Sequence, residues 1–186
     1  DSVGMSEFPL VLVPALGSDH RLWEPVIALL SDFVECIVIR GEGNTIEAMA
    51  DSVLAQAPQE FYLAGISMGG YVSLEIALRQ TGRVKALALL NTSAAAAPES
   101  RKANSVNLIR MASNGEFEQA VAMISTSVAP LRPDVADLAA IMAHDLGPDV
   151  FNDQQTAVMN RTDRHGELPA LDLPVLTIVG DADNIT

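Results

Sequence analysis

A serine placed between two glycines is the feature of this sequence with the clearest chemical potential. The segment Gly65-Ile66-Ser67-Met68-Gly69 follows an apolar run and precedes a stretch with helical spacing. Glycines on both sides allow the sharp strand-to-helix turn that presents a serine clear of the sheet, and Gly70 would keep the helix close to the sheet. The hydroxyl can attack a carbonyl carbon once a base takes its proton. We therefore expect Ser67 to be the nucleophile of an acyl-transfer reaction.

The negative charge created by such an attack needs hydrogen-bond donors beside the serine. The backbone N–H of Met68 is available because the helix begins there, and the helix N-terminus adds positive potential. An earlier apolar run ends in the turn Pro14-Ala15-Leu16-Gly17, whose N–H groups could complete an oxyanion hole. The chemistry therefore requires these two segments to meet.

The apolar pattern predicts the elements that would bring them together. Continuous apolar runs are typical of strands buried on both faces of a parallel sheet. The run at residues 8–13 is of this kind, and further mainly apolar runs occur at residues 34–39, 61–64, 84–90 and 174–179. Helical spacing separates the first four runs, at residues 22–30, 46–57 and 68–80. This alternation predicts an α/β fold, with a mostly parallel sheet, flanking helices and right-handed crossovers.

The pattern changes between residue 94 and about residue 169. Strand signatures are absent there, and helical periodicity occurs at residues 106–111, 116–125 and 133–144. We therefore predict a core made of residues 5–93 and 170–186, with a helical cap formed by residues 94–169. The alanine tract at residues 94–97 would be the hinge into this cap, with Pro98 in the first turn of a helix.

Composition restricts the partners of the protein. The chain has 11 Lys and Arg against 24 Asp and Glu, a formal net charge of −13. Phosphates would be repelled, so nucleic acid and anionic membranes are not expected as partners. No apolar run is long enough to cross a bilayer, and a single cysteine, Cys36, excludes an intrachain disulfide. We expect a cytoplasmic protein in which Cys36 is a buried, reduced thiol.

The sequence gives no reason to expect a cofactor or a metal ion. Gly41-Glu42-Gly43 follows a predicted strand but lacks the third glycine of a dinucleotide-binding loop. The histidines lack the spacing of metal ligands on a helix. We therefore predict catalysis by side chains and backbone alone.

These segments together resemble the α/β-hydrolase superfamily, in its branch of small, capped, esterase-like and acyl-hydrolase-like members. The resemblance lies in residues 11–17, 63–71, 89–93 and 179–183. It implies that the Leu16 N–H is the second oxyanion donor and that Asp183 orients the catalytic histidine. The family's Gly-x-x-Asp spacing selects Asp183 over Asp181, which we expect in a turn. Ala15 stands where the family often has glycine, which an L-residue tolerates if φ stays negative.

The resemblance also implies a histidine base that this chain does not supply. In the superfamily the order is nucleophile, acid and then histidine, and this chain stops at Thr186. We expect the last core strand and its helices to be missing, so that the chain is truncated at its C-terminus. We expect His20, His144 and His165 to be surface residues at a helix start, at a helix end and in a polar loop.

The leading hypothesis is a serine hydrolase that cleaves an ester, thioester or related acyl substrate through an acyl-enzyme, nearly inactive as this chain. The apolar cap residues would either roof an acyl pocket or form the cap's own core. Perhydrolases and carbon–carbon hydrolases share the elbow, whereas dehalogenases have aspartate in place of Ser67. The alternative is a non-catalytic binding or interaction module without the base. An edge strand at residues 174–179, or the cap, could support a homodimer.

Overall fold

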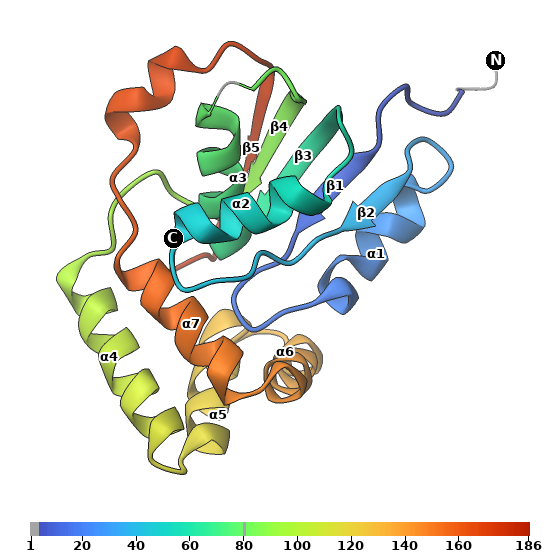
Figure 1. Cartoon of the computed structure of the whole chain (residues 1–186). Helices are drawn as coiled ribbons and strands as arrows, with labels where there is room; N and C mark the ends of the chain where they lie inside the picture. The colour runs from blue at the N-terminus through green and yellow to red at the C-terminus, as the bar shows by residue number, and fades with distance from the viewer. Residues whose placement is uncertain (1–3, 80) are drawn as a thin grey trace.

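The computed structural model describes residues 4–79 and 81–186, and it contains a parallel sheet with helices on both faces (Figure 1). The strands are β1 (Leu10–Val13), β2 (Cys36–Val38), β3 (Phe61–Ile66), β4 (Val84–Leu90) and β5 (Val175–Ile178). They lie in the order β2-β1-β3-β4-β5, and every neighbouring pair is parallel. The predicted parallel α/β architecture is confirmed.

Alternating strand residues build a core on each face of the sheet. The helices are α1 (His20–Leu30), α2 (Ile46–Gln56) and α3 (Met68–Leu78). Val11 and Val13 pack in one cluster with residues of α2 and α3, whereas Leu12 packs with Trp23 of α1 on the opposite face. The helices therefore form two layers around the sheet, as the period of two along a strand requires. The predicted end of the third helix, residue 80, lies outside the described residues.

Three of the predicted strands, β1, β2 and β5, are shorter than their apolar runs. β1 begins at Leu10, because Pro9 has no N–H to donate and takes part only as the acceptor of the Tyr62 N–H. β2 has three residues, and Cys36 within it is half-buried rather than fully buried. Its partial burial raises the pKa of the Cys36 thiol.

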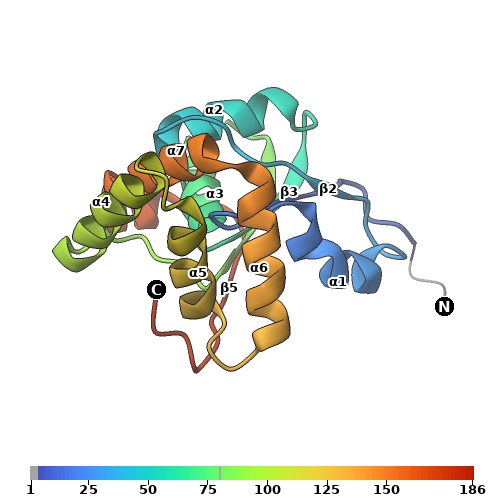
Figure 2. The same ribbon diagram turned by 90° about the horizontal axis from the view of Figure 1, so that it is seen from below.

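The segment between β4 and β5 is helical, and it stands over one end of the sheet (Figure 2). It contains α4 (Glu99–Ser113), α5 (Phe117–Val128), α6 (Pro133–Leu146), α7 (Pro148–Met159) and the short helix η1 (His165–Ala170). The pattern did not predict α7, because two buried residues of this helix, Gln154 and Gln155, are polar and break the apolar spacing. Pro98 is the N-cap residue of α4, so its expected place in the first turn was wrong by one residue.

The apolar residues of the segment pack mainly on one another. Leu108 and Met111 of α4, Ala120 of α5 and Phe151 of α7 form one buried cluster, with Phe117 against Phe151 at a centroid distance of 5.5 Å. Of the two alternatives left open by the sequence, the structure favours a core within the cap over an apolar roof.

β5 lies at the edge of the sheet. Val175, Leu176 and Ile178 are each more than two-fifths exposed, although their side chains are apolar. An edge strand on this run was expected. Across residues 4–79 and 81–186, none of the helices has both the length and the hydropathy of a membrane span.

Candidate active site

Ser67 has the backbone conformation expected at the tip of a nucleophile elbow. It lies between the end of β3 and the start of α3 with φ of 53° and ψ of −117°. In the described chain, only Asn91 is a second non-glycine residue with positive φ. Such a conformation costs free energy for an L-residue, so the surrounding structure must hold it.

The backbone of Ser67 is held by the end of β4. The Ser67 N–H donates to the Leu90 carbonyl at 3.0 Å. The Ser67 carbonyl accepts from the Thr92 hydroxyl at 2.8 Å and from the Gly70 N–H at 2.9 Å. These bonds fix the turn on both sides of the strained residue.

The glycines of the elbow occupy positions where a side chain has no space. A Cβ atom at Gly65 would overlap the Gly69 carbonyl, and one at Gly69 would overlap the carbonyl of Val13. A Cβ atom at Gly70 would overlap the side chain of Thr92. Close approach of β1, β3 and α3 therefore depends on these glycines.

The expected oxyanion donors border the same pocket as the serine. Leu16, Ser67 and Met68 all line it, with Met68 as the first residue of α3. Ala15 does not have a positive φ, so its side chain is accommodated where the family often has glycine. The structure thus brings together the two segments that the chemistry requires.

A side chain of the cap holds the turn that carries Leu16. The Gly17 N–H donates to Oε1 of Gln154 at 2.8 Å, although these residues are 137 positions apart. Gln154 is 1% exposed, so the bond is shielded from water. This contact was not predicted, because no local pattern connects a glutamine in a helix with a distant turn.

Asp183 lies just beyond β5, in the loop that follows the strand. Its carboxylate accepts from the Asn91 amide at 3.1 Å, from the Ile185 N–H at 2.8 Å and from the N–H and hydroxyl of Thr186. Partial burial raises the pKa of Asp183, but the hydrogen bonds from Thr186, Ile185 and Asn91 outweigh it and lower the pKa below its usual value. The group is therefore a carboxylate at neutral pH, whereas Asp181 lies in an exposed turn.

Asn91 connects the serine side of the site with the aspartate side. It follows β4 directly, its N–H donates to the Ile178 carbonyl at 2.8 Å, and its amide reaches Asp183. Ser67, Asn91 and Asp183 thus follow the carboxyl ends of β3, β4 and β5, the edge at which ligands bind in parallel α/β sheets. Asn91 was not predicted to have a role, because its only signal was a place in a segment similar to the family's.

The three histidines lie on the surface, each beside an acidic residue. His20 Nε2 is 3.5 Å from Glu24, His144 Nε2 is 3.2 Å from Glu118, and His165 Nδ1 is 3.2 Å from Asp163. Their side chains are 66%, 60% and 59% exposed, and none of them lines the pocket of Ser67. All three lie on the surface as expected, but His165 is the first residue of η1 rather than part of a loop. Among the residues described, no group of His, Cys, Asp and Glu is arranged to hold a metal ion.

The pocket at Ser67 lies between the core and the cap. Its cap side is formed by four residues, Pro98, Arg101, Val158 and Arg161, and Tyr71 of α3 and Ile185 complete it. Its volume is about 60 Å³, enough for a few water molecules. The two arginines were not identified from the sequence, because isolated basic residues in helical segments carry no motif.

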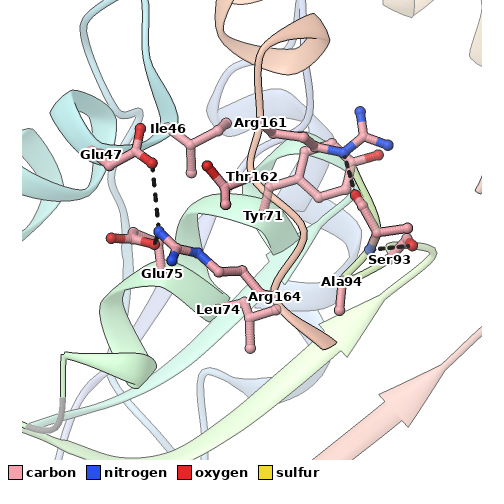
Figure 3. A pocket seen from close by; sticks show the side chains of 11 residues that line it. Ile46, Glu47, Tyr71, Leu74, Glu75, Ser93, Ala94, Arg161, Thr162 and Arg164 are labelled. Atoms are coloured by element: carbon pink, nitrogen blue, oxygen red, sulfur yellow. Dashed lines mark hydrogen bonds and ion pairs between the residues drawn. The ribbon is translucent and has the colours of Figure 1, made fainter. Parts of the chain in front are cut away.

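A neighbouring pocket shows how the chain returns from the cap to the core (Figure 3). Arg164 meets Glu75 of α3 at 2.6 Å and Glu47 of α2 at 3.5 Å. Arg161 lies over the ring of Tyr71, with its guanidinium carbon 4.2 Å from the centroid. Arg161 lines both pockets, so the contacts that fix this segment also fix one wall of the site at Ser67.

Comparison with known proteins gives matches to an esterase and a putative carbamate hydrolase. A pimeloyl-[acyl-carrier protein] methyl ester esterase from Legionella pneumophila (strain Paris) is 33% identical over 91 residues, which cover 46% of this chain and 38% of the relative. The putative carbamate hydrolase RutD from Agrobacterium fabrum is 32% identical over 126 residues, which cover 59% of this chain and 48% of that protein. The matched regions thus span less than half of the length of each of these relatives.

A solved structure and a family model extend the match over almost the whole chain. A thermophilic esterase from Thermogutta terrifontis superposes with a TM-score of 0.82 at 24% identity, covering 97% of this chain and 74% of the esterase. At this identity the likeness shows the fold. The model of the Alpha/beta hydrolase family matches residues 10–185. This chain therefore belongs to the alpha/beta hydrolase family.

Proposed function

We propose that this protein is a serine hydrolase that cleaves an ester, thioester or related acyl bond through an acyl-enzyme on Ser67. The observation that carries the proposal is the left-handed backbone of Ser67, fixed at a strand-to-helix turn beside the segments of Leu16 and Met68. A strained residue at the carboxyl edge of a parallel sheet indicates a functional position. The esterase and carbamate hydrolase relatives support an acyl substrate.

The proposed reaction has two halves. Ser67 Oγ attacks the carbonyl carbon while a base takes the hydroxyl proton, and the backbone N–H groups of Leu16 and Met68 hold the oxyanion. The bond to the leaving alcohol or thiol then breaks, and the leaving group departs with the proton. Water cleaves the acyl-serine ester in the second half, releasing the acid and restoring the hydroxyl. Asp183 would orient the base.

The proposal assigns the base to a group outside the described residues, because the three histidines are exposed and turned to other partners. It is therefore tested on the complete product of the gene that encodes this chain. A fluorophosphonate probe reacts with an activated serine, and mass spectrometry of the digest identifies the labelled residue. We expect one adduct, on Ser67.

Two variants serve as controls for the labelling experiment. Ser67→Ala should remove the adduct, whereas Ser127→Ala should leave it unchanged, because Ser127 lies on the exposed side of α5 and donates only to the Met123 carbonyl. A folded protein that carries no adduct on Ser67 would refute the proposal. Binding of a ligand without labelling or turnover would favour the non-catalytic alternative.

A further inference from the structure

Within the part of the chain that the structure describes, two arginines beside Ser67 have no acidic partner. Among residues 4–79 and 81–186, every Lys and Arg except Arg83, Arg101 and Arg161 has a carboxylate oxygen within 4.0 Å. Arg83 is satisfied differently, because its guanidinium donates to the carbonyls of four residues between Leu54 and Gln59. Arg101 and Arg161 remain, and both line the pocket of Ser67.

The two guanidinium groups are fixed in place, but only part of each is used. Arg161 donates through Nε to the Ala95 carbonyl at 2.9 Å and through Nη1 to the Val158 carbonyl at 3.0 Å. Arg101 donates through Nη1 to the Ser105 hydroxyl at 2.8 Å and to the Gln155 amide oxygen at 3.2 Å. An arginine has five N–H donors, and within the part of the chain that the structure describes Nη2 of each residue has no acceptor.

The electrostatic surroundings of this pair are unfavourable without an anion. Burial lowers the pKa of Arg101, Tyr71 has the opposite effect, and the nearby charge of Arg161 lowers the pKa further. Burial also lowers the pKa of Arg161. The protein has 24 acidic residues, yet none of the described ones is within 4.0 Å of either guanidinium. Two half-buried cations held near each other in so acidic a chain indicate a site for negative charge.

We infer that Arg101 and Arg161 bind a carboxylate of the substrate, so that the ester cleaved at Ser67 also carries a free acid group. This inference rests on the proposed function. The free Nη2 of each guanidinium can donate to a carboxylate oxygen, and the ion pair that results is stronger than a hydrogen bond to a neutral ester. The substrate class is therefore the half-esters of dicarboxylic acids, in which one carboxyl group is esterified and the other is free.

Matched pairs of esters test the inference on the complete gene product. Monomethyl glutarate and monomethyl adipate are compared with methyl pentanoate and methyl hexanoate, which have the same chain lengths without the acid. We expect kcat/KM to favour the half-esters. Arg101→Met or Arg161→Met should each lower this preference about tenfold to a hundredfold, the loss expected for one charge-assisted hydrogen bond.

Further variants control for the loss of a positive charge and for the loss of the fold. Arg132→Met removes an exposed arginine at the start of α6, paired with Asp134, and should keep the wild-type preference. Arg161→Lys keeps the charge without the paired N–H groups and should give an intermediate preference. The comparison of each half-ester with its neutral partner in the wild-type protein does not depend on any variant. Equal kcat/KM for the two members of each pair would overturn the inference, even if an arginine variant failed to fold.

A binding measurement separates this inference from the proposed function. Calorimetry on Ser67→Ala with glutarate and adipate requires no turnover, and the same two arginine substitutions in that background should weaken binding. Hydrolysis of neutral esters without binding of dicarboxylates refutes the carboxylate site alone. Absence of both labelling and turnover, with dicarboxylates still bound, refutes the hydrolase alone. Inorganic phosphate that binds as tightly as adipate would refute the assignment to a carboxylate.

Discussion

The contact between Gly70 and Thr92 gives the sharpest test of how the elbow is built. Gly70→Ala adds a Cβ atom that would lie closer than 3.0 Å to the Thr92 side chain. Thr92 cannot simply move away, because its hydroxyl donates to the Ser67 carbonyl at 2.8 Å. The substitution therefore sets helix propensity against packing within the first turn of α3.

The magnitudes of these opposing effects predict that Gly70→Ala lowers the free energy of unfolding in the wild type and raises it when the Thr92 side chain is absent. Overpacking costs about 1–3 kcal/mol, and loss of the Thr92 hydrogen bond costs about 1 kcal/mol. Alanine in place of a helical glycine returns about 0.5–1 kcal/mol. Gly70→Ala should therefore lower the free energy of unfolding of the wild type by about 2 kcal/mol. In a Thr92→Gly background, which removes the obstacle, the same substitution should raise it by about 0.5–1 kcal/mol.

Denaturant unfolding of the two single variants and the double variant measures this coupling. Gly69→Ala is the matched control, because its Cβ would meet the backbone of Val13 and Pro14, which no change at Thr92 removes. It should destabilise both backgrounds equally. If Gly70→Ala has the same effect in the wild type and in the Thr92→Gly background, the steric argument for this glycine is wrong.

Two further predictions concern charged groups away from Ser67. Arg164→Met should lower the free energy of unfolding by about 1–3 kcal/mol, because it removes an ion pair with Glu75, which is only 9% exposed. The loss is smaller than for a fully buried pair, because Nε of Arg79 remains 3.6 Å from the Glu75 carboxylate. An unchanged denaturation midpoint would contradict this. Hydrogen bonds from Arg132 lower the pKa of Asp134 to about 2. The stability that these bonds confer is therefore fully present above the ordinary carboxyl pKa of about 3.9, and it is lost as the pH falls from there to about 2. Carboxyl NMR titration should show this pKa moving toward about 3.9 in Arg132→Gln, and a midpoint that does not move would exclude Arg132 as its cause.

Local patterns were enough to predict the core of the fold. Strands β1 and β3 are runs of continuous apolar character, β4 is apolar apart from Lys85, and α1 and α2 begin within two residues of the start of their helical spacing. The elbow was also predictable, because glycines 65, 69 and 70 and the serine between them lie within one short segment. In these cases sequence neighbours are also neighbours in space, so the pattern and the contact coincide.

The cap was predicted less well because its buried polar residues form hydrogen bonds with residues that are distant in the sequence. Helix α7 has Gln154 and Gln155 fully buried, and each amide oxygen accepts from a residue in another element. A buried glutamine in a helix has the same sequence appearance as an exposed one, since only its partner makes burial favourable. Hydrophobic periodicity therefore failed at a helix whose buried apolar residues, Phe151, Ala157 and Val158, are interrupted by two buried glutamines.

The position of α7 links the two sides of the proposed site. Gln154 in this helix holds the Gly17 N–H in the turn that carries Leu16, and Val158, four positions further, accepts from Arg161. Helix α7 therefore contacts the oxyanion turn through the side chain of Gln154 and the arginine beside Tyr71 through the backbone carbonyl of Val158. A shift of α7 relative to the sheet would thus change the support of the oxyanion hole and the place of the anion together. The core supplies the proposed nucleophile, and the helices between β4 and β5 contribute contacts around it that no segment of the chain reveals by itself.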